Sequence, residues 1–463
     1  MLSDLAFALA VRGHAVEVIA ARLTYDGVRA LPKNEIVGGV TINRVSTTAF
    51  GRGKLLGRTL DYVTFFASAS FSLLCHARRG DLVVVKTDPP LLAVLAAPIA
   101  RLKGARHINW LQDIFPEVAS ALGMGQTRVQ QGALSLLRWV RDLTLRYAAA
   151  NVVLGGRMAD EVRRRGVREE RITIIANWAD GRDIHPIERQ NNALREEWGL
   201  REAFVVGYSG NLGRAHDLET MLSAIRMLED KTRLARLALV EARESDWHAQ
   251  RALSRTRSRA EKLIDDRPLQ HRPASELGGD AVEGPDKGPV PDCVFRWLFI
   301  GGGAQMDRLK RAVKAGGHDS VTFKPYQPRE RLAASLSVAD VHLISLKPEL
   351  EGFIVPSKYY GIAAAGRPAI FIGDPDGEIA RIIRRSATGF VVREGDGTGL
   401  AEAILLLAGD RALAARQGGR ARKMFESEFG LSRAVTAWES LICKVSQARD
   451  PKQAPEMNAI EKS

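Results

Sequence analysis

The sequence predicts an α/β protein with two doubly wound domains, each a parallel sheet covered by helices. The chain has 463 residues, enough for two or three domains of ordinary size. Short β-branched or apolar runs alternate with amphipathic stretches, which is typical of strands and helices in a parallel sheet. The alternation stops at the polar stretch 177–202 and starts again at residue 204, so the sequence indicates two domains.

The first domain is predicted over residues 1–180. Its predicted strands are 14–20, 82–85, 106–111, 151–154 and 171–176, and its predicted helices are 4–10, 91–103, 133–149 and 158–165. Ser3 and Gly13 are the expected caps of the first helix, so the chain enters this domain at a helix. In a doubly wound sheet that helix follows a central strand and a glycine-rich turn, and the sequence shows neither.

We therefore expect a first domain without its first strand, because either the true start lies upstream or this copy is damaged. An upstream extension is expected to encode a strand that ends in a glycine-rich loop. Without that strand, the neighbouring strands expose backbone groups and apolar faces. The chain as printed is therefore expected to be poorly soluble or inactive.

A linker at 181–202 precedes the second domain, predicted over residues 203–425. Its predicted strands are 204–208, 297–300, 321–323, 341–346, 368–372 and 390–392, with a helix at 217–228. Residues 231–292 lack periodicity and are expected to form a flexible insertion. A last helix is expected within 426–445, before a disordered tail at 446–463.

Charge and composition limit the classes of partner. The net charge is +13, and residues 1–180 hold 24 basic and 15 acidic side chains, a net +9 that suits an anionic ligand or surface. The basic and apolar stretches 51–58 and 136–146 indicate either a dock on anionic lipid or ordinary solvated helix faces. The longest apolar stretch, 62–75, is too short to span a bilayer, and no signal peptide is visible. Three distant cysteines fit a reducing cytoplasm, and no nucleic-acid motif is present.

Candidate binding residues follow the predicted strands, at the edge where open α/β sheets bind ligands. The first cluster comprises Gly210, Asn211, Gly213 and Arg214, and a weaker one is 301–303. Glycines let the backbone approach a phosphate and an arginine can pair with it, although an ordinary strand–helix turn explains the pattern equally well. Ser357 is expected to cap a helix that Lys358 opens, forming an anion site or simply a capped helix with a solvated lysine.

Acidic candidates lie in both domains. Asp113 and Glu117 follow the strand 106–111, where they favour a helix dipole or accept the proton of an attacking hydroxyl. His14 is a lone histidine, more often structural than functional. The pair Asp374 and Asp376 has a metal-binding spacing, but it lies in a Gly/Pro turn and no metal site is predicted.

These segments, in this order, resemble the family 4 (group 1) glycosyltransferases of the GT-B fold, in the branch of bacterial exopolysaccharide, O-antigen and colanic-acid enzymes. The matching text is LAFALAVRGHAVEVIA, KTDPPLL, LQDIFPEVASALG, YSGNLGRAHDLETML, LFIGGGAQ, VPSKYYGIAAAGRPAI and GEIARII followed by TGFVV. The resemblance covers nearly the whole chain to about residue 445, except 231–292. It implies two Rossmann-like domains, with the last helix crossing back to the first.

The resemblance also implies a retaining, metal-independent transfer from a nucleotide-sugar in the C-terminal domain to an acceptor on the N-terminal one, with no cofactor. The donor diphosphate would contact Gly210, Asn211, Gly213, Arg214, Ser357 and Lys358. The base, ribose and sugar would lie near Gly302, Gly303, Phe323, Tyr326, Glu351 and Glu378. The acceptor side would hold Asp113, Glu117 and His14.

The chain departs from the family pattern at the donor site. The second glutamate of the paired motif aligns with Gly361, and the usual Arg and Lys align with Asn211 and His216. Arg214 and Lys358 would then carry the charge of the diphosphate.

The leading prediction is transfer from a UDP-type donor to a lipid-linked or saccharide acceptor in envelope polysaccharide synthesis. A nucleotide-sugar 2-epimerase of the same fold and an inactive nucleotide-binding remnant are the alternatives. The predicted location is cytoplasmic, with a peripheral position on the inner face of the membrane.

Overall fold

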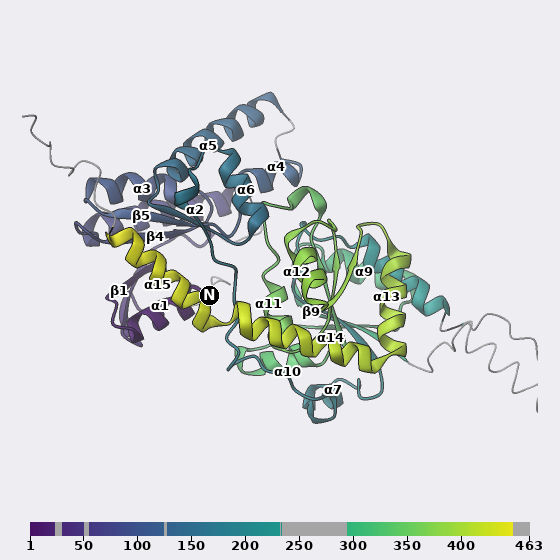
Figure 1. Ribbon diagram of the computed structural model, residues 1–463. Helices are drawn as coiled ribbons and strands as arrows, with labels where there is room; N and C mark the ends of the chain where they lie inside the picture. The colour runs from purple at the N-terminus through teal and green to yellow at the C-terminus, as the bar shows by residue number, and fades with distance from the viewer. Residues whose placement is uncertain (24–29, 51–54, 125–126, 232, 234–293, 448–463) are drawn as a thin grey trace, which may run out of the picture.

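The computed structural model describes residues 1–23, 30–50, 55–124, 127–231, 233 and 294–447 (Figure 1). Most of the expected insertion at 231–292 and of the expected tail at 446–463 lies outside these residues. The chain forms an N-terminal and a C-terminal α/β lobe, and its last helices return from the second lobe to the first (Figure 1). The predicted fold class, two doubly wound α/β domains, is confirmed.

The strands of the N-terminal lobe form two separate sheets. One has the order β1 (Val16–Ala21), β3 (Val40–Val45), β2 (Asn34–Val37), with β2 antiparallel. The other is parallel, in the order β4 (Leu82–Lys86), β5 (Arg106–Trp110), β6 (Ala150–Val153), β7 (Ile172–Ile174). Among the described residues β1 and β4 each keep one edge without a strand partner. Val84 of β4 is accordingly 38% exposed, although the sequence predicts a buried strand.

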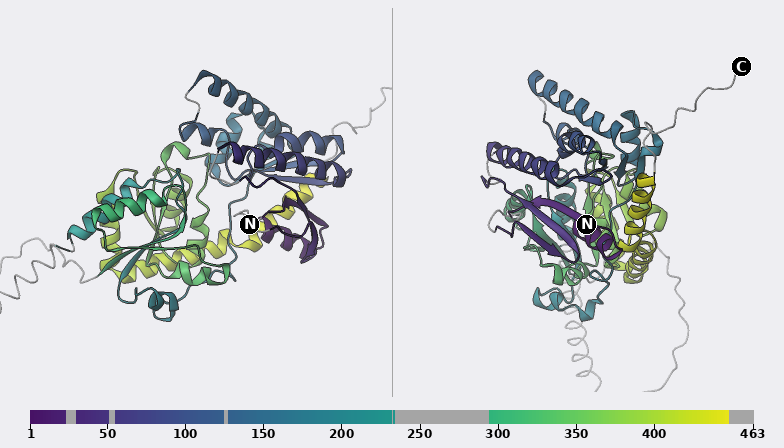
Figure 2. Two further views of the ribbon diagram at one scale, coloured as in Figure 1. Left: turned by 180° about the vertical axis from the view of Figure 1, so that it is seen from behind. Right: turned by 90° about the vertical axis from the view of Figure 1, so that its left-hand side faces the viewer.

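Helices on both faces join these sheets into one lobe. On one face, α1 (Leu2–Val11) contacts α15 (Leu431–Gln447), and Leu5, Trp110 and Trp438 share a buried cluster. On the other face, α2 (Leu55–His76), α3 (Leu92–Leu102) and α5 (Arg128–Tyr147) lie side by side (Figure 2). Because α1 begins at Leu2, the expected N-cap Ser3 lies inside the helix and Met1 takes the cap position.

The C-terminal lobe is built on one parallel sheet of six strands. Their order is β10 (Val321–Lys324), β9 (Phe295–Gly302), β8 (Phe204–Asn211), β11 (Val341–Ser345), β12 (Ala369–Ile372), β13 (Gly389–Val392). A helix at 219–231, α9 (Met306–Gly316) and α13 (Gly397–Gly409) cover one face, and α11 (Lys358–Ala364) and α12 (Glu378–Ser386) the other. The central strands are buried on both faces, as their apolar runs predict.

The last helices connect the two lobes. α14 (Arg411–Met424) packs on the C-terminal lobe, a π-helical turn follows at Phe425–Phe429, and α15 lies on the N-terminal lobe (Figure 1). Trp438 of α15 is fully buried there, with its ring centroid 5.1 Å from that of Trp110. The final helix therefore completes the core of the first lobe.

Candidate active site

Two glycine-containing strand ends lie next to each other in the C-terminal lobe. In the parallel pairing of β8 with β9, Gly210 is opposite Gly301 and Asn211 is opposite Gly302. Gly301 has a φ of +122°, and a β-carbon added there would lie 2.4 Å from the carbonyl oxygen of Gly210. Only glycine fits at this position, because the two backbones occupy the space of a side chain.

The turns after these strands leave a surface of bare backbone. A β-carbon on Gly303 would lie 2.4 Å from Oδ1 of Asn211, so this second turn also packs directly against the first. We call the backbone of 210–213 and 301–303 the glycine shelf. The structure thus brings together five of the predicted donor-site residues: Gly210, Asn211, Gly213, Gly302 and Gly303. They lie at the carboxyl edge of the sheet, where such sheets bind ligands.

One aromatic ring lies over the glycine shelf. Tyr326 follows β10 and is 61% exposed, and a β-carbon on Gly302 would be 3.3 Å from its ring. Phe323, the other predicted aromatic contact, packs inward on Phe299 with ring centroids 5.8 Å apart. Tyr326 is therefore the ring of the pair that a flat ligand at the shelf could reach.

The Lys358 side chain reaches the glycine shelf from the first position of α11. Its Nζ would be 3.9 Å from a β-carbon on Gly210. The ammonium donates a hydrogen bond of 2.5 Å to the hydroxyl of Tyr208 and lies 3.9 Å from the centroid of that ring. Within the described part of the chain it forms no ion pair with a carboxylate. Burial without a counter-charge lowers the pKa of Lys358 to about 7.

A neutral histidine and an exposed arginine also lie near the shelf. His216 contacts the carbonyl oxygen of Ser345 through Nδ1 at 2.6 Å, and burial together with the Lys358 ammonium lowers the pKa of His216 to about 4. Arg214 is exposed and makes no hydrogen bond or ion pair with the described residues. The shelf therefore combines bare amides with two cationic side chains that have no carboxylate partner there, a combination that suits a diphosphate.

Ser357 does not cap α11. It occupies the N-cap position, but its side chain accepts no capping hydrogen bond, and it is exposed. The predicted cap is therefore wrong. The helix has only seven residues, so the positive charge at this point comes from Lys358 rather than from a long helix dipole.

Glu351 and Glu378 lie at a contact between the lobes. The backbone amide of Glu378 donates to Glu351 at 2.8 Å, and burial raises the pKa of Glu351. The Glu378 carboxylate accepts the amide of Arg157, at the start of α6 (Gly156–Arg164) in the N-terminal lobe, at 3.3 Å. The Arg157 guanidinium pairs with Asp374 at 2.8 Å, so the first of the two aspartates with metal-like spacing holds an ion pair between the lobes.

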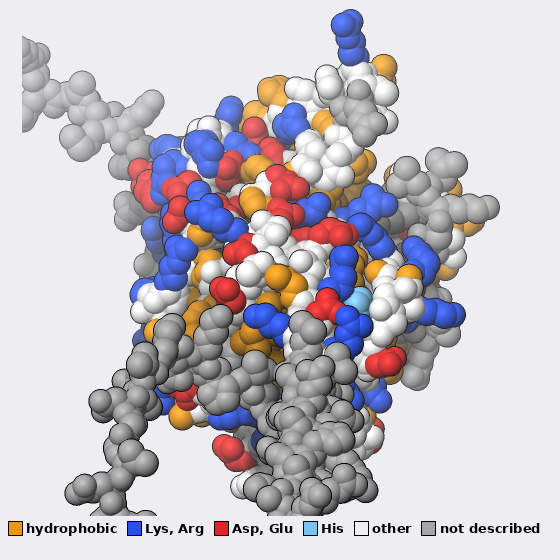
Figure 3. Space-filling model, turned by 90° about the vertical axis from the view of Figure 1, so that its right-hand side faces the viewer, with side chains coloured by type: hydrophobic (Ala, Val, Ile, Leu, Met, Phe, Trp, Pro, Cys, Tyr) orange, Lys and Arg blue, Asp and Glu red, His pale blue; other side chains and the backbone are white. Residues whose placement is uncertain are grey.

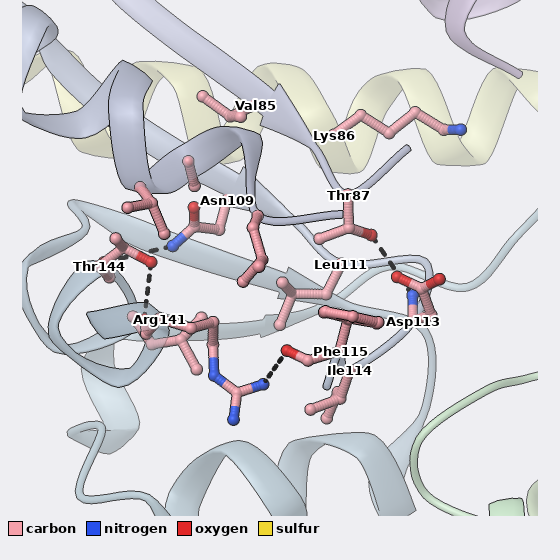
Figure 4. Close-up of a pocket in the computed structure, with 14 residues that line it drawn as sticks. Val85, Lys86, Thr87, Asn109, Leu111, Asp113, Ile114, Phe115, Arg141 and Thr144 are labelled. Carbon is pink, nitrogen blue, oxygen red and sulfur yellow. Dashed lines mark hydrogen bonds between the residues drawn. The ribbon is translucent and has the colours of Figure 1, made fainter. Parts of the chain in front are cut away.

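Asp113 is an acidic group of the N-terminal lobe at its junction with the C-terminal lobe. It follows β5, and its backbone forms an isolated bridge with Ile354 of the C-terminal lobe. The Thr87 hydroxyl, after β4, accepts a hydrogen bond from the amide of Gln112 at 2.8 Å and one from the amide of Asp113 at 3.4 Å; Figure 4 shows the second. Burial, only partly opposed by Thr87, raises the pKa of Asp113 to about 6. Its buried Oδ1 has no hydrogen-bond partner among the described residues.

Glu117 is held by two arginines. It begins α4 (Glu117–Ala121), and its Oε1 accepts Arg141 at 2.7 Å and Arg165 at 2.9 Å. Burial alone would raise the pKa of Glu117, but the two guanidinium groups outweigh it and lower the pKa. Glu117 therefore connects helices through its ion pairs, and Asp113 is the acid of the two that has no arginine partner among the described residues.

His14 is not brought near Asp113. It lies at the amino end of β1, 3.4 Å from Glu439 of α15, whereas Asp113 follows the carboxyl end of β5. The structure gives His14 a contact between α15 and the first sheet.

Tyr208 and Arg157 were not predicted from the sequence to be site residues. Tyr208 is hidden in the apolar run of β8, but it shares a strand face with Gly210, two residues on, and that spacing is a usable signal. Arg157 follows two glycines after β6, the same pattern of glycine after a strand that marked the donor site.

Two family models match different parts of the chain. The model described as "Glycosyl transferase 4-like domain" matches residues 1–178, and "Glycosyl transferases group 1" matches residues 287–410. The chain is 24% identical over 357 residues to a protein of Pseudomonas aeruginosa named as a glycosyltransferase, WbjE, covering 76% of the chain and 72% of WbjE. It is 23% identical over 385 residues to an Escherichia coli K12 protein named as a colanic acid biosynthesis glycosyl transferase, WcaI. This match covers 81% of the chain and 79% of WcaI.

Solved structures share the two-lobed arrangement. Sucrose-phosphate synthase from Thermosynechococcus elongatus matches with a TM-score of 0.65 at 17% identity, covering 96% of this chain and 92% of that one. Anabaena HepE, in complex with UDP and glucose, matches with a TM-score of 0.61 at 14% identity, covering 96% of this chain and 95% of HepE. The fold is thus that of the GT-B proteins. Within that class the chain belongs to the glycosyltransferases of the family 4, group 1 type, as its sequence motifs predict.

Proposed function

We propose that this chain is a retaining glycosyltransferase of bacterial envelope polysaccharide assembly. It would move a sugar from a UDP-type donor to a lipid-linked or saccharide acceptor, without a metal or other cofactor. The observation that supports this most is the Lys358 ammonium, which lies beside the glycine shelf without a carboxylate partner in the described residues. The name of the WcaI relative and the HepE complex with UDP and glucose support the process and the donor class.

The donor would bind with its diphosphate on the glycine shelf. Negative charge grows on the departing phosphate oxygen as the bond to the sugar breaks, and fixed positive charge in a water-poor site lowers that barrier by about 3 kcal/mol or more. Lys358 and the exposed Arg214 would supply this charge. Tyr326 would stack against the nucleotide base, and Glu351 would accept a hydrogen bond from a hydroxyl of the donor.

The acceptor would approach from the N-terminal lobe. Asp113 lies at the junction of the lobes, and its buried Oδ1 has no hydrogen-bond partner among the described residues, so it would receive the proton of a hydroxyl that enters there. With a pKa of about 6, Asp113 is ionised at neutral pH and is a stronger base than an ordinary aspartate. These two properties support Asp113, rather than Glu117, as the proton acceptor.

The same lobe carries an apolar face that fits a lipid surface. Its large side chains are more than one-third exposed and point outward: Leu60, Val63, Phe71 and Leu74 on α2, Leu95 and Leu102 on α3, and Val129, Leu136, Trp139 and Tyr147 on α5. We call these residues the α2–α3–α5 face, since α3 contacts both other helices (Figure 2). None of the helices over the described residues is long and apolar enough to cross a membrane.

Charge around this face favours anionic lipid. Arg101 on α3 and Arg128 and Arg146 on α5 are exposed, in a domain with a net charge of +9. A solvated helix surface rarely gathers this many large apolar side chains, whereas an interfacial surface combines them with arginine. We therefore propose that the protein works at the inner face of the cytoplasmic membrane, docked by the α2–α3–α5 face.

Two other functions remain distinguishable by one assay. The split sheet of the N-terminal lobe favours an inactive nucleotide-binding remnant, and an epimerase of the same fold would need no acceptor. The full chain is incubated with UDP-sugars, with and without lipid-linked acceptor from bacterial membranes, and released UDP and saccharide product are measured. Acceptor-dependent release of UDP supports the proposal. Sugar interconversion without acceptor indicates the epimerase, and binding without turnover indicates the remnant.

A further inference from the structure

Tyr208 is rigidly held directly below the glycine shelf. It lies in β8, two residues before Gly210, and is fully buried. Its ring contacts Phe299 and His216, each with centroids 6.0 Å apart, and its hydroxyl donates to the carbonyl oxygen of Asn211 at 3.0 Å. The phenol therefore cannot turn without disturbing the end of β8.

The hydroxyl of Tyr208 has one acceptor site aimed at Lys358. A phenol has one proton and two lone pairs, and its proton is used by the carbonyl of Asn211. A lone pair is thus available for the ammonium of Lys358 at 2.5 Å, and the ring lies 3.9 Å from the same nitrogen, within range of a cation–π interaction. Burial raises the pKa of Tyr208 well above its usual range, so the phenol stays neutral and cannot act as a base.

We infer that Tyr208 is the positioning residue of Lys358: its hydroxyl and ring hold the ammonium beside Gly210, where the donor diphosphate would lie. A lysine side chain has four rotatable bonds and is strongly hydrated, so without such a partner the ammonium would turn toward water. The inference rests on the proposed function, because it explains how Lys358 is presented to a phosphate.

Two histidines also lie near the ammonium. His216 follows β8, and His342 lies on β11; burial chiefly, together with the charge of Lys358, lowers the pKa of each to about 4. Both are neutral near pH 7, and no carboxylate among the described residues pairs with Lys358. Tyr208→Phe therefore removes the hydrogen bond that the ammonium of Lys358 makes within the described part of the chain, while the ring is kept. The pKa of Lys358 should then fall.

The test is an NMR titration of the full chain with its lysines dimethylated with carbon-13. Lys358→Arg assigns the signal, and Tyr208→Phe is expected to move its midpoint to lower pH. The turnover rate should fall about tenfold or more, with a smaller change in donor KM, as for loss of a hydrogen bond to a charged group. Tyr359→Phe is the matched control. Tyr359 follows Lys358 in the sequence and is also buried, but its hydroxyl forms a hydrogen bond with that of Thr388 at 3.0 Å. This variant should change neither the midpoint of the Lys358 signal nor the turnover rate.

An unchanged midpoint in a folded Tyr208→Phe variant would overturn the inference. If that variant does not fold, the inference is tested on the wild type. Nuclear Overhauser contacts between the Lys358 methyls and the Tyr208 ring are expected, and their absence would overturn the inference. These NMR readouts need no donor. Contacts without transferase activity would therefore reject the proposed function alone, and activity without contacts would reject the positioning role alone.

Discussion

Donor binding is expected to draw a proton onto Lys358. Burial lowers the pKa of Lys358 to about 7, so at pH 8 only about one molecule in ten carries the ammonium. A diphosphate on the glycine shelf would place negative charge beside it and return the pKa toward its ordinary value of 10.5. The difference corresponds to an uptake of about 0.9 proton per bound donor at pH 8. His216 and His342 add nothing, because both are neutral there.

Calorimetry measures this uptake directly. UDP is titrated into the protein at pH 8 in two buffers with different ionisation enthalpies, and the dependence of the observed enthalpy on the buffer gives the number of protons. The wild type should take up about 0.9 proton and Lys358→Met close to none. Lys314→Met, at an exposed lysine of α9, should behave as the wild type. Binding of UDP to the wild type without proton uptake would refute the placement of the diphosphate beside Lys358.

Three further predictions concern other parts of the site. Asp113→Asn should lower the turnover rate about 100-fold or more while UDP binding is kept. The turnover rate of the wild type should fall as the pH drops below about 6, because Asp113 becomes protonated there. Equal pH–rate profiles for the wild type and Asp113→Asn would contradict this role. Gly303→Ala should lower the free energy of unfolding by about 1–3 kcal/mol and weaken UDP binding, since its β-carbon would lie 2.4 Å from an Asn211 side-chain atom. Gly409→Ala, where nothing lies within 4 Å, is the urea-denaturation control. Replacing Phe71 and Trp139 by Ser should weaken co-sedimentation with vesicles of anionic phospholipid about tenfold without changing UDP binding; unchanged sedimentation would remove the lipid-docking role.

The second lobe was predictable because its strands carry an uninterrupted signal. Runs such as 204–208 and 368–372 are apolar throughout, and this is what a parallel strand covered on both faces requires. The glycine clusters then marked the carboxyl edge of the sheet, since a close approach of β8 and β9 excludes side chains there. The entry into the first lobe was also predictable, because the sequence indicates a helix at the start of the chain and the structure has α1 there.

Other elements of the first lobe gave no clear period. α2 is apolar on its packed side and on its outward side, where Phe71 is 69% exposed, so the helical period is lost. β2 and β3 are short, half-exposed strands with mixed polarity, and they were not predicted. An outward apolar face leaves no local trace that distinguishes it from a core face, and only the packing of α2 on α3 shows which side is which.

The roles of single acids and cations depend on contacts distant in sequence. Glu117 was predicted to be a candidate base, but it is held by arginines 24 and 48 residues further along the chain. Lys358 was predicted to contact phosphate, yet its partner Tyr208 is 150 residues away. Because such pairings are set by tertiary packing, a sequence can propose the reacting side chain but not the group that positions it.

The central claim is that the C-terminal lobe gathers positive charge for a nucleoside diphosphate. The most direct measurement is the melting temperature of the full chain with UDP, other nucleotides and UDP-sugars, in the wild type, Lys358→Ala and Lys314→Ala. A uridine diphosphate or its sugar should raise the melting temperature of the wild type and of Lys314→Ala, but not that of Lys358→Ala. No shift with any nucleotide, or an equal shift in all three proteins, would contradict the account.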